Sequence, residues 1–233
     1  MERRQLTQHV AINAAKLVKA HHDEELWRDI VESHIVGIDG MGIVWAARLL
    51  GIRVPERVAG VDLMERLLAL CAERGFHPYF LGARREVLER AVTRARGRWP
   101  GLQFAGYHDG YFSQDEEQNV VAAIRDAKAD CLFIGMPTPR KERFLHLYRD
   151  SLDVPFIMGV GGGLDVLAGQ VRRAPTAMQN AGLEWLYRIY QEPRRMWWRY
   201  ASTNFVFAGL VGKALLGRLY PGRGGSNKIG AEG

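Results

Sequence analysis

The order of hydrophobic and polar positions predicts that strands and helices alternate through most of the chain. Short apolar runs alternate with stretches in which apolar residues recur every three or four positions, as on a helix with one buried face. Runs that are apolar throughout are typical of strands covered on both faces. The pattern therefore predicts an α/β fold with a mostly parallel sheet and helices on both of its faces. The predicted strands begin near residue 9 and lie at 34–38, 77–83, 102–106, 130–135 and 154–159.

The most informative stretch is 36–63, where an apolar run leads into Asp39-Gly40-Met41-Gly42. A helical pattern follows and stops at Gly51, so the stretch reads as a strand, a tight turn and a helix start. Glycines at 40 and 42 allow a sharp turn and the close approach of a ligand. Asp39 is then presented at the carboxyl end of a strand, where open α/β sheets bind their ligands. Two interpretations stay open: a residue that caps the helix, or a base that points into a cleft.

Other loops after predicted strands also carry candidate residues. Because carboxyl ends of parallel strands meet at one edge of a sheet, these loops should gather there and form a cleft of the nucleotide-binding type. Gly161 and Gly162 belong to a glycine-rich turn that is compatible with a phosphate site or with a plain turn. Asn13 follows the first strand, and its side chain is typical of a helix cap. The converging loops are Asp39-Gly40, Gly82, Pro137–Glu142 and Gly159–Gly163.

The last quarter of the chain differs in charge and aromatic content. Residues 170–223 carry nine arginines and lysines against two glutamates, which accounts for the whole net charge of +6. Tryptophans and tyrosines lie among these arginines, and the apolar stretch 204–220 follows, interrupted by Lys213 and Arg218. The combination is typical of a helix that lies in a membrane interface, and an ordinary packing helix pair is the alternative. We predict an α/β core at 1–170, a basic aromatic helical appendage at 171–220 and a disordered tail at 221–233.

Composition narrows the class of protein further. The 233 residues are enough for one large domain with a sizeable core, and the two cysteines lie in apolar runs, which favours buried thiols over disulfides. The polar, basic start lacks the apolar run of a signal peptide, so we expect a cytoplasmic location. No metal-binding motif, Walker loop or nucleophile elbow occurs, and there is no Asp-x-Asp to hold a nucleotide's metal ion. We therefore expect no metal and no other cofactor.

A series of short motifs carries a resemblance to a known family. In chain order they are Asp39-Gly40, Pro55-Glu56-Arg57-Val58 with Gly60 and Asp62, Phe80-Leu81-Gly82, Trp99-Pro100-Gly101 and Gly110-Tyr111-Phe112. The most specific are Arg173-Ala174-Pro175, the run GLEWLYR that ends at Arg188, and Gln191-Glu192-Pro193 with Arg195 and Tyr200. On these residues, from about Asn13 to Tyr200, the chain resembles the WecG/TagA/CpsF family of bacterial glycosyltransferases (family 26).

The resemblance implies a Rossmann-like enzyme that transfers a sugar from a UDP-sugar to an undecaprenyl-diphosphate-linked sugar at the inner membrane face. It implies inversion at the anomeric carbon without a metal, which one base is sufficient to support, whereas glycoside hydrolases use two carboxylates. Asp39 is then the general base, and Asn13 and Arg57 line its pocket. Arg188 and Arg195 are implied to contact the diphosphate. The remaining candidate substrate-binding residues are Asp62, Gly82, Lys141, Glu142, Gly161 and Gly162.

The chain departs from the family pattern in three ways, two of which fall near the donor pocket. Ala11 stands where the family usually has threonine, and Lys141 stands where it usually has glutamine. Both changes leave the donor sugar open among N-acetylmannosamine, glucose and uronic acid types, and Lys141 is suited to meet a carboxylate or a phosphate. Fewer residues than usual precede Asn13, so a first strand is expected to be missing.

Two other functions stay open at this point. A catalytically degenerate family member would bind a nucleotide-sugar or a membrane without turnover. A nucleic-acid-binding protein would use the arginines and aromatic rings of the appendage for phosphates and bases, although the apolar stretch 205–216 argues against this. The appendage also has two interpretations, since its apolar face would serve either the membrane or self-association into a homo-oligomer.

Overall fold

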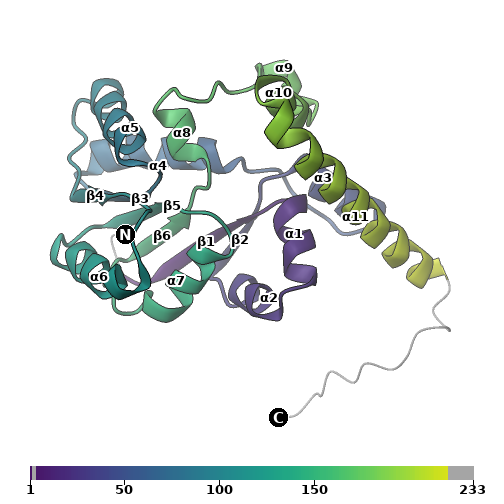
Figure 1. Ribbon diagram of the computed structural model, residues 1–233, viewed down its shortest axis with the longest axis horizontal. Helices are drawn as coiled ribbons and strands as arrows, with labels where there is room; N and C mark the ends of the chain where they lie inside the picture. The colour runs from purple at the N-terminus through teal and green to yellow at the C-terminus, as the bar shows by residue number, and fades with distance from the viewer. Residues whose placement is uncertain (2–3, 220–233) are drawn as a thin grey trace, which may run out of the picture.

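The computed structural model describes residue 1 and residues 4–219, except for the side chains of Asn180, Arg195, Arg199, Arg218 and Leu219. Its centre is a six-stranded, all-parallel sheet in the order β2-β1-β6-β5-β3-β4 (Figure 1). The predicted Rossmann-like α/β class is confirmed, and the predicted tail at 221–233 lies outside the described residues. The strands are β1 (Thr7–Ile12), β2 (Ile35–Ile38), β3 (Pro78–Gly82), β4 (Gly106–His108), β5 (Cys131–Gly135) and β6 (Phe156–Gly159).

Helices cover both faces of the sheet (Figure 1). One face carries α4 (Gly60–Arg74), α5 (Arg85–Arg98) and α8 (Gly163–Leu167), which pack on side chains such as Phe80, Phe133 and Met158. The other face carries α1 (Ala14–His21), α2 (Glu24–Val31), α6 (Glu117–Asp126) and α7 (Arg140–Tyr148). Alternate residues of the same strands, including Leu81 and Ile157, form a second core under α6 and α7. The central strands β3 and β5 are buried on both faces, which explains their uninterrupted apolar runs.

Local signals fix several helix ends. Asn13 caps α1, because its Oδ1 accepts a hydrogen bond from the backbone N–H of Lys16 at 3.0 Å. The segment before Asn13 forms a full strand, β1, between β2 and β6. Helix α3 (Met41–Leu49) begins directly after Gly40, as its pattern predicts. Gly75 ends α4 with a φ of 68°, a conformation that glycine adopts without strain.

One predicted strand is displaced. The apolar run at 102–106 predicts a strand, but the ladder with β3 forms at Gly106–His108 instead. Leu102 is buried in the core, and the ring of Phe104 lies 4.9 Å from that of Phe80, so these residues cover the sheet from a loop. The first backbone bond to the neighbouring strand runs from Ala105 N–H to the carbonyl oxygen of Pro78. A short 3₁₀ turn, η1 (Gln114–Glu116), then precedes α6.

The predicted appendage consists of helices. After α9 (Thr176–Asn180) and α10 (Glu184–Gln191), one long helix, α11 (Pro193–Leu219), packs against α1 and α10 (Figure 1). Its buried side includes Met196, and Phe207 lies beside Gly42 of α3. Within the described residues, no helix is both long enough and apolar enough to span a membrane. The two cysteines are buried and free, as predicted, with their sulfur atoms 3.5 Å apart.

Candidate active site

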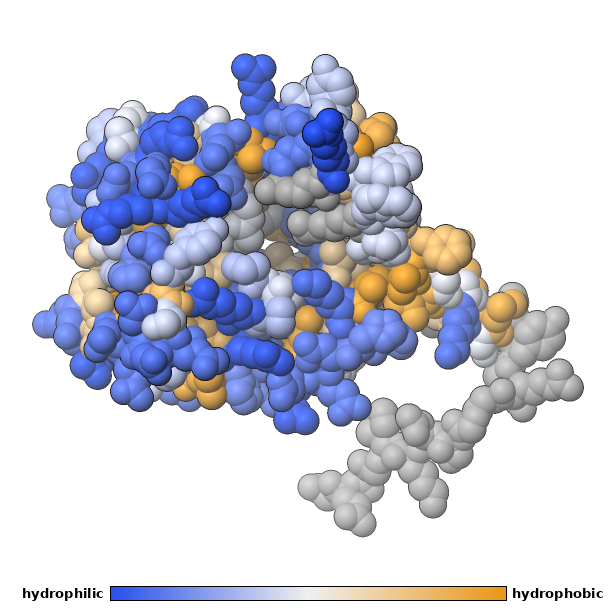
Figure 2. Space-filling model, in the orientation of Figure 1, coloured by the Kyte–Doolittle hydropathy of each residue, from blue (hydrophilic) through white to orange (hydrophobic). Residues whose placement is uncertain are grey.

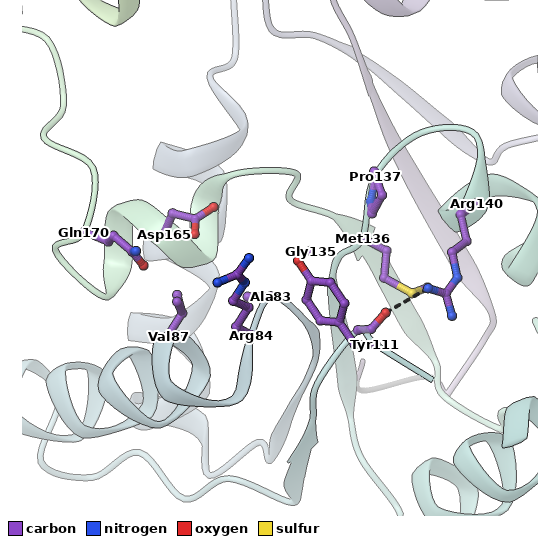
Figure 3. A pocket seen from close by; sticks show the side chains of 11 residues that line it. Ala83, Arg84, Val87, Tyr111, Gly135, Met136, Pro137, Arg140, Asp165 and Gln170 are labelled. Carbon is purple, nitrogen blue, oxygen red and sulfur yellow. Dashed lines mark hydrogen bonds between the residues drawn. The ribbon is translucent and has the colours of Figure 1, made fainter. Parts of the chain in front are cut away.

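A cavity lies at the carboxyl ends of the central strands β3 and β5, whose connections lead toward opposite sides of the sheet. From β3 the chain passes through α5 to β4 at the sheet edge, whereas from β5 it passes through α7 to β6 toward the middle. Such a switch point is where open α/β sheets bind ligands. The cavity has a volume of about 490 Å³, which is within the range of small-molecule sites. Its walls are formed by Ala83, Arg84, Val87, Gly110, Tyr111, Gly135, Met136, Pro137, Arg140, Asp165 and Gln170 (Figure 3).

The floor of this cavity requires glycine. A Cβ atom on Gly82 would lie 2.6 Å from the carbonyl carbon of Gly135, and Gly82 also has a φ of 128°. A Cβ atom on Gly110 would lie 3.0 Å from the Cα of Gly82. The backbones at the ends of β3, β4 and β5 are therefore in close contact. Because these glycines have no side chains, the space above them stays open. Gly82, predicted as a substrate-binding position, lies at the base of the cavity.

The amino end of α5 faces the same space. Ala83, Arg84 and Val87 line the cavity, and α5 has no side-chain cap at its first turn. An uncapped helix start presents backbone N–H groups and a positive dipole end, which together favour an anion. Figure 3 shows the guanidinium of Arg84 pointing into the space between Asp165 and Tyr111. This wall is therefore suited to a phosphate group.

The opposite wall is a loop that α7 holds in place. Arg140 donates one hydrogen bond to the carbonyl oxygen of Gly110 at 2.9 Å and another to that of Phe112. Its guanidinium also lies 4.6 Å from the centre of the Phe112 ring. Between these two anchors, Tyr111 is 70% exposed at the cavity, and Asp109 accepts a hydrogen bond from its backbone N–H. The loop thus presents a flat aromatic ring to any molecule in the cavity.

Asp39 lies on the other part of the same edge, at the end of β2. Its Oδ1 accepts a hydrogen bond from the backbone N–H of Gly60 at 3.1 Å. Burial raises the pKa of Asp39 above its usual value, against the Gly60 bond and the nearby charges of Arg57 and Arg188, which lower it. Glu184 lies close enough to raise the pKa further. A carboxylate with a raised pKa takes up a proton more readily, which is the property of a general base.

The turn at the end of β6 connects the cavity with the surroundings of Asp39. A Cβ atom on Gly162 would lie 3.4 Å from a guanidinium nitrogen of Arg188 and 3.7 Å from the carboxylate of Asp165. Asp165 lines the cavity, whereas Arg188 is near enough to Asp39 to affect its pKa. Gly161 precedes this point with a φ of 51°. Arg188 therefore lies between the two parts of the site.

Two predicted ligand contacts have protein partners in this structure. Arg57 donates hydrogen bonds to the carboxylate of Glu184 at 2.8 Å and to the carbonyl oxygen of Gln179 at 3.0 Å. Asp62 accepts two hydrogen bonds from Arg173, which lower the pKa of Asp62. Both residues therefore join the α/β core to the appendage beside Asp39. The ion pairs link residues more than 100 positions apart, so no local pattern in the sequence announces them.

Lys141 and Glu142 belong to a buried cluster that also contains Lys16. Oε1 of Glu142 lies 2.9 Å from Nζ of Lys16 and 3.0 Å from Nζ of Lys141, and it accepts a hydrogen bond from the Thr138 hydroxyl at 3.2 Å. Burial raises the pKa of Glu142, but the two ammonium groups together outweigh it and lower that pKa to about 2. Burial and the charge of Lys16 lower the pKa of Lys141 to about 8. Sequence reasoning missed Lys16, because nothing distinguishes it from an exposed helical lysine.

Besides Lys141 and Glu142 in this cluster, the predicted residues lie either near Asp39 or near the cavity. Asn13 adjoins the Asp39 turn, because a Cβ atom on Gly40 would lie 3.3 Å from the Asn13 Cβ. Arg57, Asp62 and Arg188 lie on the Asp39 side, and Gly162 lies between Arg188 and the cavity residue Asp165. Gly82 lies next to Gly110 and Gly135, which line the cavity. Arg195 is in α11, with its side chain outside the description. The site residues that sequence reasoning missed are the cavity's polar and aromatic side chains, which lie in or beside the loops that follow the strands: Arg84, Tyr111, Arg140, Asp165 and Gln170.

A parallel sheet with a cavity at its switch point is typical of nucleotide-binding α/β proteins. Within that class the chain belongs to the glycosyl transferase WecG/TagA/CpsF family, whose model matches residues 1–220. This match confirms the resemblance inferred from the motifs, and it implies a glycosyltransferase of cell-surface polysaccharide synthesis. Among the described residues, no three His, Cys, Asp or Glu side chains gather in a way that would hold a metal ion.

Proposed function

We propose that the protein transfers a sugar from a UDP-sugar to an undecaprenyl-diphosphate-linked sugar, with inversion at the anomeric carbon. The observation that carries the proposal is the position of Arg188, between the switch-point cavity and Asp39. A nucleotide in the cavity would direct its diphosphate toward Arg188 and its sugar toward Asp39. The order of the cavity, Arg188 and Asp39 along this edge of the sheet supports the proposal, because a nucleotide-sugar needs a nucleotide site, a cation and a base in that order.

Within the cavity, each part of UDP meets suitable chemistry. Uracil stacks on the exposed ring of Tyr111, since base–aromatic stacking needs only a flat apolar face. The diphosphate binds at the uncapped start of α5 with Arg84, and Arg188 extends this positive region toward the sugar. These groups stabilise the negative charge that develops on UDP as it leaves.

Asp39 acts on the acceptor. Its carboxylate takes the proton of the attacking hydroxyl while the acceptor oxygen bonds to the anomeric carbon from the face opposite UDP. The C–O bond to UDP breaks in the same step, so one sugar–oxygen bond replaces another and the configuration inverts. The Gly60 N–H holds the carboxylate in position, and its raised pKa suits it to accept the proton.

The acceptor lipid places the reaction at the inner face of the cytoplasmic membrane, where α11 provides a docking surface. Trp198, Phe205 and Leu216 lie on one stripe of α11, within about five helical turns. Their side chains are 76%, 83% and 60% exposed. Figure 2 shows hydrophobic residues along the side formed by α11. An apolar, aromatic stripe on a basic helix is typical of interfacial membrane binding, and anionic lipids attract its arginines.

The test is release of UDP from a panel of UDP-sugars, with and without a short-chain prenyl-diphosphate-linked sugar and with and without EDTA. We expect release that requires the acceptor and survives EDTA. Asp39→Asn, which can still accept the Gly60 hydrogen bond, should lower kcat by about 100-fold or more while UDP still binds. Transfer by this variant at the wild-type rate would exclude Asp39 as the base. UDP binding without transfer to any acceptor would favour the catalytically degenerate alternative.

A further inference from the structure

Helix α3 is apolar on its buried side and also on its exposed side. Ile43, Val44 and Ala47 are buried. Trp45 and Leu49, which are four positions apart and share the opposite side of the helix, are 49% and 63% exposed. A helix that is apolar all round is typical of a position where both sides are covered. The outer side of α3 is therefore suited to contact a partner.

The turn that follows α3 adds one more exposed apolar residue. Gly51 has a φ of 66° and lies in the turn that ends the helix. The backbone N–H of Ile52 then donates a hydrogen bond to the carbonyl oxygen of Ala47 at 2.8 Å. This bond holds Ile52, which is 52% exposed, against the end of the helix. We call the side chains of Trp45, Leu49 and Ile52 the α3 face.

The charges in and around the α3 face are positive. Residues 41–55 contain two charged side chains, Arg48 and Arg53, which are both exposed, and they contain no acidic residue. Arg48 lies three positions after Trp45 and therefore on the same side of the helix. An arginine can lay its apolar stem along such a surface while its guanidinium reaches water. Apolar side chains bordered by cations complement the acyl region and the anionic headgroups of a bilayer.

The α3 face adjoins the appendage that carries the exposed stripe of α11. A Cβ atom on Gly42 would lie 3.8 Å from the ring of Phe207 in α11. A Cβ atom on Gly182, just before α10, would lie 2.6 Å from the Cβ of Met41 and 3.1 Å from the ring of Trp45. Figure 1 shows α3 at the same end of the molecule as α11. A bilayer is broad enough to contact both helices at once.

We propose that the α3 face enters the membrane interface as a second contact beside α11, and that its partner is a bilayer containing anionic lipids. The inference rests on the membrane location in the proposed function and adds a surface that orients the site. Because α3 begins directly after Asp39 and Gly40, Leu49 lies roughly 14 Å from this turn along the helix. With Leu49 in the interface, Asp39 stays close to the headgroups, within reach of a sugar on a lipid-anchored diphosphate. The α3 face thus sets the distance between the base and the membrane.

The first experiment places a polarity-sensitive fluorescent dye on the full chain, at Leu49→Cys or at Leu147→Cys. Leu147 of α7 is the matched control, because it is 63% exposed, as Leu49 is. The native Cys71 and Cys131 are buried, so the dye labels the introduced thiol of the folded protein. On addition of vesicles of phosphatidylglycerol and phosphatidylcholine we expect a blue shift of the emission at Leu49→Cys and none at Leu147→Cys. Leu49→Ser should weaken vesicle binding about 10-fold, and Leu147→Ser should not weaken it.

The second experiment separates this inference from the proposed function. Leu49→Ser should lower transfer to a prenyl-diphosphate-linked sugar embedded in vesicles about 10-fold, through weaker vesicle binding. The same variant should keep the wild-type rate with a water-soluble, short-chain acceptor. A wild type that shows the dye shift but transfers to neither acceptor would overturn the proposed reaction and support the membrane contact.

Two results would overturn the role of the α3 face. One is an unshifted emission at Leu49→Cys on vesicles that the protein does bind, because the membrane contact would then belong to α11 alone. The other is a dimer in analytical ultracentrifugation that Leu49→Ser dissociates, with no dye shift on vesicles. The α3 face would in that case contact a second copy of the chain, for which the exposed Ile35 and Val36 of the edge strand β2 offer further apolar surface. A wild type that does not bind vesicles at all would overturn both membrane contacts.

Discussion

Lys141 gives a prediction about stability that needs no substrate. Its ammonium lies in the folded protein beside Lys16, away from water, and its pKa is lowered from 10.5 to about 8. The unfolded chain binds this proton more tightly than the folded protein does. Between about pH 8 and pH 10.5 the unfolded state therefore holds more protons, and stability rises with pH across this window. The lowered pKa corresponds to roughly 3 kcal/mol of folding free energy, fully gained only at the alkaline end.

The perturbation is Lys141→Met, which removes the charge, keeps a flexible side chain and leaves Lys16 paired with Glu142. The assay is urea unfolding of wild type and variant at about pH 7.5 and about pH 10. We expect the wild type to gain about 2–3 kcal/mol relative to the variant between these values. For a chain of this size the same difference corresponds to roughly 5–10 °C in Tm. Lys213→Met, at an exposed position on α11, is the control and should follow the wild type.

One result would refute this reasoning directly. If the free energies of unfolding of wild type and Lys141→Met differ by the same amount at both pH values, then Lys141 keeps the same proton affinity in the folded and unfolded chains. The ammonium would in that case be solvated, and the close approach to Lys16 and Gly159 would not describe the protein in solution.

Three further predictions concern the site and the appendage. Tyr111→Ala should weaken UDP binding about 10- to 100-fold because the stacking surface is lost, whereas Tyr111→Phe should bind UDP nearly as the wild type does. Titration with UDP measures both variants, and equal UDP affinities of Tyr111→Ala and the wild type would exclude stacking. Trp198→Ser should reduce co-sedimentation with anionic vesicles about 10-fold or more, while Trp27→Ser, at a half-exposed tryptophan of α2, should not. Glu184→Gln removes a charge that raises the pKa of Asp39, so the acidic limb of the pH–kcat profile should move to lower pH; an unmoved limb would mean that Asp39 does not control it.

The fold was predictable because each strand leaves a local signature. Strands β3 and β5 are buried on both faces, so their sequences are apolar throughout, and a glycine ends each of them. The run at 102–106 is apolar apart from Gln103, yet Leu102 and Phe104 cover the sheet from a loop. Apolar residues indicate burial, but strands and the loops that cover a core are both buried. The start of β4 depends on its ladder with β3, which no local pattern encodes.

Topology made the shared position of some candidate residues predictable. Asp39 follows β2 and Gly82 ends β3, and a parallel sheet brings such positions to one edge without any detail of side-chain packing. Sequence reasoning could not assign partners across the chain. Arg57 pairs with Glu184, and Lys16 pairs with Glu142, because segments that are far apart in the chain are packed together. Those pairings link Arg57 to the appendage and place Lys16 in a buried charged cluster, and neither arrangement can be read from a local pattern.

The partners of Arg57 and Asp62 bear on how the base is controlled. Arg57 and Asp62 belong to the α/β core, whereas Glu184 and Arg173 belong to the appendage, and the four side chains form ion pairs beside Asp39. The charges that act on Asp39 therefore come from both parts: Arg57 from the core, and Glu184 and Arg188 from α10. A carboxylate's pKa depends on its distance from such charges. The proton affinity of Asp39 therefore depends on the position of α10 relative to the core. Because α10 also packs on α11, the helix with the exposed aromatic stripe, the same helices that we propose to meet the membrane set the chemistry of Asp39.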